Sequence, residues 1–302
     1  MSDGADGALG GVVGGSEASA RRTKADLARG LAPLGWLPIS WYAIFLVGPL
    51  ALVLVTSFAT RGSYGGIEWR PSLDSFARAI DPLYSMILMR SLVLALITAC
   101  SCFVIGLPVA LAMATSSARA RSVYVLLLAV PFLTNLIIRI CALKSIVAYD
   151  GPLATILAGL GFAVDRFALS QNLSLVYFGM ISSYLPFMVF PLYAALERFD
   201  FALIEAALDL GATYRQVITR VLVPSLKRAI VSGTLLVFIP AFGEFVIPDL
   251  LGGAKAMLIG NLISEQFLKA RDWPFGASLS VILLAGLAAA IVLIRRLEGK
   301  AT

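Results

Sequence analysis

The chain has 302 residues, of which 59% are hydrophobic and only 14% are charged, and its mean hydropathy is +0.90. A soluble domain carries about a quarter charged residues, so this apolar excess indicates a protein of the lipid bilayer, with no room for a sizeable soluble domain. The net charge of +6 comes from basic residues scattered between apolar segments, which argues against nucleic-acid binding.

Histidine and cysteine usage excludes several kinds of site. The chain contains no histidine, so histidine metal ligands, histidine general bases and histidine pH switches are ruled out. Cys100, Cys102 and Cys141 all fall inside apolar runs, where we expect them to be small buried hydrophobic side chains. No metal site and no disulfide is predicted.

The N-terminal part divides into a tail and a first apolar segment. Residues 1–33 are rich in Gly, Ala and Ser and lack apolar periodicity, which predicts a disordered cytoplasmic tail. Residues 34–58 are too long for the apolar region of a signal peptide, so they are predicted to be an uncleaved first span.

Five more apolar segments, each about as long as a helix that crosses the hydrocarbon, follow the first. They are residues 92–115, 123–143, 173–196, 229–251 and 275–294. The fold class predicted is all-α integral membrane, with six transmembrane helices and a short cytoplasmic tail at 297–302. Prolines within several segments predict kinked helices that line an internal space, in contrast to a plain membrane anchor. Lys and Arg are more frequent in the loops on the same side of the membrane as the N-terminus, most clearly at 116–122 and in the C-terminal tail. Because cytoplasmic loops carry an excess of these residues, both termini are predicted to be cytoplasmic.

The cytoplasmic loop at residues 200–228 has the pattern of two short helices. Asp200 is an N-cap type residue and Gly211 closes the first helix. Thr213 to Gln216 is a capping-box pattern that opens the second helix, which Pro224 is expected to end. Apolar residues of the second helix are predicted to share one face: Tyr214, Val217, Ile218, Val221 and Leu222. Pattern alone also allows an amphipathic loop that lies on lipid headgroups.

The spacing in this loop resembles that of a known family. Glu205-Ala206-Ala207, then Gly211, then Val221-Leu222-Val223-Pro224 are similar to the EAA loop of ABC importer permeases, with Val at two positions where the family has Ile and Leu. The resemblance implies that the loop is a coupling helix pair that docks on a separate ATP-binding subunit. The coupling residues it implies are Glu205, Ala206, Ala207, Gly211, Tyr214, Val217, Ile218, Val221, Leu222 and Pro224.

Four further segments, at 131–139, 151–153, 243–253 and 271–274, look like those of spermidine/putrescine importer permeases. This resemblance covers residues 34–296, taken as one six-span permease domain, and implies a type I, binding-protein-dependent importer of the bacterial inner membrane. It implies a polyamine cargo, although related permeases carry other organic solutes. The partners implied are two ATPase copies, a second related permease and a periplasmic or lipid-anchored solute-binding protein.

One acidic residue, Glu244, lies inside a predicted span, where an ionisable group is a functional-site candidate. A carboxylate with aromatic neighbours suits an alkylammonium substrate. The alternative is a structural Glu244 that pairs with Arg139 or a partner subunit, or hydrogen-bonds a broken helix. Other candidates for the substrate path are Tyr184, Phe187, Phe242, Phe245 and Asn135. Arg139 is expected near the outer end of the third span, where a long side chain can reach the interface.

No phosphate-binding Gly-x-x-x-x-Gly-Lys-Ser/Thr loop occurs in the chain. The prediction is therefore a transport subunit that is not itself an enzyme and holds no cofactor, with ATP and Mg²⁺ bound by the partner. An ion-coupled secondary transporter would need coupling-ion sites in the membrane, and only Glu244 offers one. A membrane scaffold is disfavoured by the prolines and glycines within the spans.

Overall fold

The computed structural model describes residues 36, 38–148, 150–160 and 172–299, and the chain divides into two units, Met1–Val55 and Thr56–Thr302. In the first unit a π-helix, η1 (Ala43–Val47), continues into α2 (Gly48–Thr56). Nearly all described side chains there are exposed, and Pro38–Thr56 has a mean hydropathy of 2.1, as a lipid-facing helix requires. The predicted tail at residues 1–33 lies outside the described residues.

The second unit begins with a small hairpin and a short helix. Strands β1 (Thr60–Arg61) and β2 (Ile67–Glu68) pair antiparallel, with Thr60 opposite Glu68. Gly65 and Gly66 turn the chain between them with φ values of 88° and 85°, which glycine adopts without strain. Helix α3 (Asp74–Ala79) follows. The hairpin was not predicted, because strands of two residues leave no alternating pattern in the sequence.

Helix α4 (Pro82–Thr115) is longer than the predicted segment at 92–115. It begins at Pro82 because the carboxylate of Asp81 accepts a hydrogen bond from the Leu83 N–H (3.0 Å) and proline suits the first helical position. At 1.5 Å per residue its 34 residues extend about 51 Å, well beyond a hydrocarbon thickness of about 30 Å. The extra turns therefore lie at the hairpin end of the bundle.

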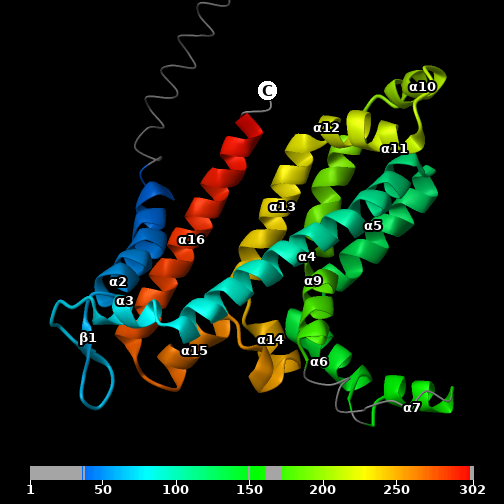
Figure 1. Cartoon of the computed structure of the whole chain (residues 1–302). Helices are drawn as coiled ribbons and strands as arrows, with labels where there is room; N and C mark the ends of the chain where they lie inside the picture. The colour runs from blue at the N-terminus through cyan, green and yellow to red at the C-terminus, as the bar shows by residue number, and fades with distance from the viewer. Residues whose placement is uncertain (1–35, 37, 149, 161–171, 300–302) are drawn as a thin grey trace, which may run out of the picture. The chain divides into compact units, whose positions relative to one another are not determined.

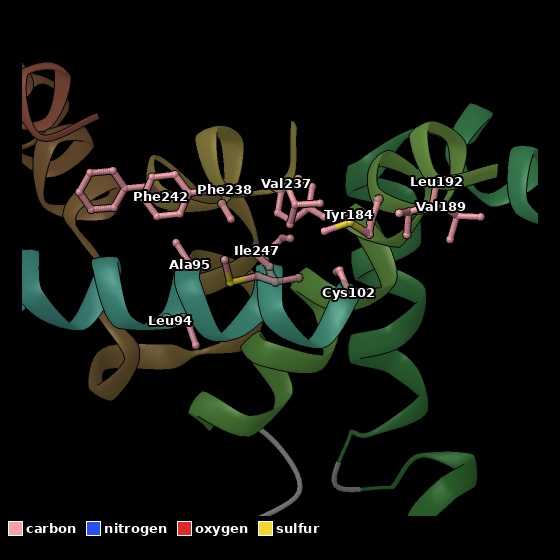
Figure 2. Close-up of a cluster of buried hydrophobic side chains, with 14 of the residues drawn as sticks. Leu94, Ala95, Cys102, Tyr184, Val189, Leu192, Val237, Phe238, Phe242 and Ile247 are labelled. Carbon is pink, nitrogen blue, oxygen red and sulfur yellow. The ribbon is translucent and has the colours of Figure 1, made fainter. Parts of the chain in front are cut away.

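The core of the second unit is formed by α4, α9 (Leu173–Leu196) and α13 (Lys227–Phe242). Met188 on α9 is fully buried between the other two helices. A Cβ at Gly106 of α4 would lie 3.1 Å from its Cγ, and one at Gly233 of α13 would lie 2.8 Å from its Sδ. Small residues thus let the three helices approach closely, as in other membrane bundles. Figure 2 shows the buried side chains of these helices, Cys102, Val189 and Phe238 among them, converging on one cluster.

Two predicted spans are not single helices. The segment 123–143 is divided into α5 (Ala118–Leu133) and α6 (Leu136–Ile146), which are bent by 94°. The segment 229–251 is divided into α13 and α14 (Val246–Leu251), with the break at residues 243–245. Pro131 and Pro240 lie shortly before these breaks, and each removes a backbone hydrogen bond from the preceding turn.

The remaining helices lie at the two ends of the bundle. Short helices α10 (Ala202–Asp209), α11 (Tyr214–Val217), η2 (Ile218–Leu222) and α12 (Val223–Ser225) form one end, which we call the loop end. The hairpin, α14, η3 (Gly253–Ala256) and α15 (Ile259–Leu268) form the other, the hairpin end, and α16 (Trp273–Gly299) runs from there to the loop end (Figure 1). Helix α7 (Pro152–Gly159) follows α6.

The fold class predicted, all-α integral membrane, is confirmed. Four helices of the described chain are long and apolar enough to cross a bilayer, and two bent pairs bring the number to as many as six if each pair is one span. The span predicted at 173–196 has the bounds of α9. The last predicted span, 275–294, lies within α16.

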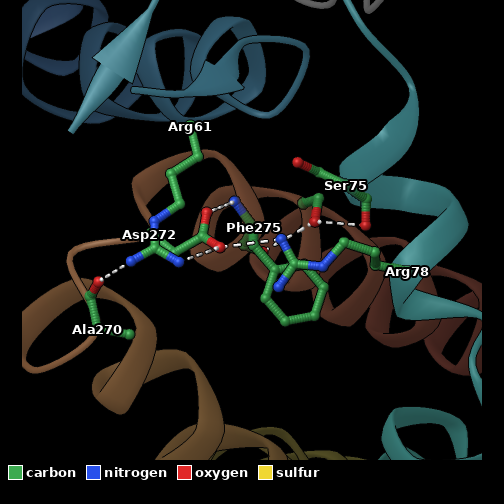
Figure 3. A network of polar contacts seen from close by, with 7 residues as sticks. Arg61, Ser75, Arg78, Ala270, Asp272 and Phe275 are labelled. Atoms are coloured by element: carbon green, nitrogen blue, oxygen red, sulfur yellow. Dashed lines mark hydrogen bonds and ion pairs between the residues drawn. The ribbon is translucent and has the colours of Figure 1, made fainter. Parts of the chain in front are cut away.

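Asp272 joins three segments at the hairpin end and is only 1% exposed (Figure 3). One carboxylate oxygen accepts from Arg78 Nη1 of α3 at 2.9 Å and lies 3.8 Å from Arg61 Nη1 of β1. The other oxygen accepts from the Phe275 N–H at the start of α16 (3.2 Å). Burial lowers the pKa of Arg78, but the hydrogen bond and charge of Asp272 reverse this and leave that pKa raised. The hairpin and α3 are thereby fixed to the start of α16.

We expect Arg78→Ala to lower the free energy of unfolding by about 2 kcal/mol, since the buried Asp272 carboxylate loses its closest charged partner. Arg70→Ala is the control, because the Arg70–Glu68 ion pair is exposed and such pairs contribute about 1 kcal/mol or less. Thermal unfolding in detergent, followed by circular dichroism, measures both. Equal losses in the two variants would contradict a stabilising role for the Asp272 cluster.

Candidate functional site

The predicted coupling loop forms a compact knob, residues 200–224, at the loop end of the bundle. Helix α10 ends in a Schellman motif: the Gly211 N–H donates to the Leu208 carbonyl (2.8 Å) and the Ala212 N–H donates to the Ala207 carbonyl (3.0 Å). Gly211 has a φ of +82°, in the left-handed region that favours glycine. The corner between the two helices therefore depends on this one glycine.

The second helix of the knob opens with the predicted capping box, which is confirmed. The Thr213 hydroxyl accepts from the Gln216 N–H (3.4 Å), and the Gln216 side chain accepts from the Thr213 N–H (2.8 Å). At the other end of the loop, Asp200 lies one residue before Phe201, the N-cap of α10, and its side chain accepts from the Ala202 N–H (3.0 Å). Each helix start is thus fixed by its own local sequence.

Two predictions about the second helix are wrong. Pro224 does not end it: the chain stays helical to Ser225 and bends at Leu226, by 74°. The turn before Pro224 is the wider turn of the π-helix η2. The chain therefore stays helical through Pro224 although proline has no N–H to donate. The predicted single apolar face is also divided, since Tyr214 and Ile218 are exposed while Val217 and Leu222 are buried.

The division leaves two sets of apolar side chains on the knob. Val217 (3% exposed) and Leu222 (2%) pack inward, and Val221 is half-buried. Apolar side chains that point into solvent are Leu203, Leu210, Tyr214 and Ile218. Glu205, Ala206, Gly211 and Pro224 are exposed as well, while Ala207 is half-buried. The predicted coupling residues therefore split into an inner set that anchors the knob and an outer set that a partner can contact.

Within the bundle, Glu244 lies at the break between α13 and α14 and is buried (7% exposed). Its Oε1 accepts from the N–H groups of the next three residues, at 3.1, 2.8 and 3.2 Å, and thereby caps α14. Its Oε2 accepts from the Tyr184 hydroxyl of α9. These four donors are neutral, and no cation of the described chain forms an ion pair with this carboxylate.

The break is also braced from α15. A Cβ at Gly260 would lie 2.6 Å from the Gly243 carbonyl oxygen and 2.7 Å from that of Glu244, so only glycine fits there. Next to it, the Asn261 side chain donates to the Phe245 carbonyl (2.8 Å). The carbonyl groups that the break frees are therefore covered by the first turn of α15.

The aromatic candidates are in different surroundings. Phe187 lies beside Tyr184, with ring centroids 6.3 Å apart, and meets Phe132 of α5 edge-on at 5.0 Å. Phe242 is 3% exposed and stacks on Phe238 at 5.6 Å, as a core residue does. Phe245 is 48% exposed. The structure thus places Phe187 beside Tyr184, the hydrogen-bond partner of Glu244, and packs Phe242 into the core.

The other broken helix holds the remaining candidates. Asn135 is exposed and caps α6 through the Ile137 N–H (2.8 Å). Arg139 does not pair with Glu244; its Nη1 donates to the Pro131 carbonyl (2.8 Å), which the break between α5 and α6 leaves free. Sequence reasoning did not single out Phe132 or Gly260. Phe132 lies within a segment rich in large apolar residues, and nothing local distinguishes a close backbone contact at Gly260.

Known proteins resemble this chain over most of its length. The family model described as binding-protein-dependent transport system inner membrane component matches residues 102–300. The spermidine/putrescine transport system permease protein PotB of Salmonella typhimurium is 42% identical over 245 residues, covering 81% of this chain and 85% of that protein. PotB of Escherichia coli K12 is 41% identical over 245 residues, with 81% and 89% covered.

A solved structure gives the same fold. A bacterial ABC transporter involved in the import of the acidic polysaccharide alginate aligns with a TM-score of 0.75 at 17% identity, covering 93% of this chain and 99% of that one. At this identity the likeness concerns the arrangement of the helices alone.

Proposed function

We infer a specific transport role from a premise that the comparisons establish: the chain belongs to the family of binding-protein-dependent transport system inner membrane components. It is a multi-pass permease subunit of an ABC importer in the inner membrane. The cargo that we propose is an aliphatic polyamine such as spermidine or putrescine. An alternative is another organic solute carried by the same family, such as an amino-acid-like compound.

The polyamine cargo is supported by two independent facts. The relatives at 42% and 41% identity are named as spermidine/putrescine permeases. In addition, Glu244 is a buried carboxylate whose charge no described cation balances, which makes the interior favourable for a cation. Phe187 lies beside its partner Tyr184, and Phe132 packs edge-on against Phe187, so the two rings add aromatic faces that suit an ammonium group.

The exposed surface of the knob supports the proposal that a separate ATP-binding subunit drives transport. Four apolar side chains point into solvent from a corner that is rigidly set by a Schellman motif and a capping box. Exposed apolar groups on a rigid corner suit a partner surface. We place an ATP-binding subunit on the knob, with ATP and Mg²⁺ held there and no cofactor in this chain. The loop end and both termini are then cytoplasmic, and the hairpin end faces outward.

Two further partners complete the proposed importer. A second, related permease would pair with this chain in the membrane, and a second ATPase copy would serve it. A periplasmic or lipid-anchored solute-binding protein would deliver the cargo to the hairpin end. A structural neighbour supports this arrangement, since its title describes an alginate ABC transporter in complex with a periplasmic protein that holds an alginate pentasaccharide.

The test is uptake by the purified complex in proteoliposomes. We expect accumulation of labelled putrescine or spermidine that requires ATP and the solute-binding protein and that an ion gradient does not replace. Accumulation driven by an ion gradient alone would contradict the ABC mechanism. ATP-dependent uptake of a different solute class, with none of either polyamine, would refute the cargo and keep the mechanism.

Glu205→Lys is expected to reduce ATP-driven uptake at least tenfold while the chain still enters the membrane. Glu205 is exposed on α10 and helps to form the outer side of the knob, so a reversed charge there disturbs docking and leaves the core untouched. Asp74→Lys, an exposed reversal at the hairpin end, is the control. Normal uptake and normal ATPase co-purification in the Glu205 variant would show that the knob is not the docking surface.

A further inference from the structure

A cavity of about 430 Å³ lies at the hairpin end, between α14, η3 and α15. Its volume is within the range of small-molecule sites, about 300–1,000 Å³. Residues that line it include Phe245, Pro248, Asp249, Met257, Asn261 and Ser264. It begins directly beyond the α13–α14 break, because Phe245 belongs both to the break and to the cavity wall. Glu244 is the residue before Phe245, so the cavity lies next to Glu244 along the chain.

The walls of the cavity are held in place by contacts that do not involve a ligand. Asn261 donates from α15 to the Phe245 carbonyl (2.8 Å), which ties the two sides together. The Ile259 N–H at the start of α15 donates to the buried Ser91 hydroxyl of α4 (2.8 Å). Gly260 lies against the carbonyl groups of the break. The cavity is therefore preformed, as binding sites usually are.

Groups with free binding capacity converge on this space. Asp249 is exposed on α14, and its carboxylate has no hydrogen-bond or ion-pair partner in the described part of the chain. The Phe245 ring, 48% exposed, forms part of the same wall. A second carboxylate, Glu265, pairs with Lys269 at 3.1 Å. The Lys269 side chain is 74% exposed, and such surface ion pairs are weak, so a bound cation can replace Lys269 as the partner of Glu265.

We propose that this cavity is an entry subsite that binds one ammonium group of an aliphatic polyamine, with Asp249 as its counter-ion and the Phe245 ring as its cation–π partner. The proposal rests on the function inferred above and adds a place where the cargo binds before it reaches Glu244. Among the lining residues that the structure describes, two carboxylates stand against one lysine, a net negative charge that disfavours an anion. Pro248 and Met257 supply an apolar wall for the methylene chain that follows the ammonium group.

Occupancy of the subsite is tested by protection of a cysteine in the complete transporter. Ser264→Cys places a thiol in the cavity wall, and its labelling rate by an impermeant maleimide is measured against the chain that has only its native cysteines. We expect putrescine to slow labelling at least fivefold, whereas the uncharged diol of the same chain length has no effect. Adding Asp249→Asn should remove the protection by putrescine.

Transport kinetics give a second readout. Asp249→Asn should raise the apparent KM for putrescine about tenfold with little change in maximal rate. The lost contact forms when the substrate enters and not during the ATP-driven conformational change. Asp74→Asn, another exposed acid at the hairpin end, is the matched control and should leave the KM unchanged.

The outcomes separate the two proposals. Normal putrescine uptake without protection of the cysteine, or with an unchanged KM in Asp249→Asn, overturns the subsite and leaves the polyamine function intact. Absence of any polyamine uptake by the unmodified transporter overturns the function and the subsite with it. Protection by the diol as well as by putrescine shows an apolar cavity without selection for charge, which also overturns the proposal.

Discussion

Replacing Gly211 by valine is expected to abolish coupled uptake, with at least a tenfold loss of rate, while the chain still folds and enters the membrane. The φ of Gly211 is +82°, and an L-residue in that region costs about 1–2 kcal/mol, more for a β-branched side chain. A Cβ at this position would meet nothing within 4 Å, so the effect comes from the backbone and not from a clash. Loss of the Schellman motif would swing α10 away from α11 and change the outer side of the knob.

A graded series checks this explanation. Gly211→Asn should retain most uptake, since asparagine tolerates the left-handed region, and Gly211→Ala should be intermediate. Uptake in proteoliposomes is measured together with ATP hydrolysis by the partner, which we expect to persist without transport in the valine variant. A ranking by side-chain size instead of by left-handed tolerance, or full uptake in the valine variant, would contradict the role given to the corner.

Local sequence signals predicted the knob well. The capping box at Thr213–Gln216 and the terminating Gly211 depend on residues a few positions apart, so their geometry follows from the sequence itself. The bounds of α9 were predicted correctly for a related reason: its apolar run ends sharply at both sides, and Asn172 caps it through the Leu175 N–H (2.8 Å). Pro224 was misread because a π-helix, which has no clear sequence signature, precedes it.

The site inside the bundle depended on contacts that no local pattern reveals. Glu244 was identified as unusual from its depth in an apolar segment, but its partner Tyr184 is 60 residues away in the chain. Phe242 and Phe245 looked alike in the sequence, and the helix break between them turns one into the core and leaves the other exposed. The steric need for Gly260 appears only when α15 is packed on the break.

Glu244→Gln separates the two roles that this residue can have. A glutamine oxygen can still accept from the three N–H groups at the start of α14, and its amide can donate to the Tyr184 oxygen, so the cap and the tie to α9 are retained. Protein level and thermal stability should therefore stay close to those of the unmodified chain. The negative charge is lost, and only a cationic cargo is affected by that loss.

We expect Glu244→Gln to weaken polyamine uptake at least tenfold. At an effective dielectric constant of about 20, a charge about 6 Å away contributes roughly 3 kcal/mol, which exceeds the 1.4 kcal/mol of a tenfold change. Tyr184→Phe is the matched control, because it removes one hydrogen bond and keeps the charge; it should cost about 2 kcal/mol of stability, as for other hydrogen bonds to a buried charged group, and leave the apparent affinity nearly unchanged. Unchanged apparent affinity and maximal uptake in Glu244→Gln would make Glu244 a helix cap alone. A capping role needs only an acceptor, which glutamine also supplies, so a loss of uptake without a loss of stability in Glu244→Gln would assign the negative charge to the cargo.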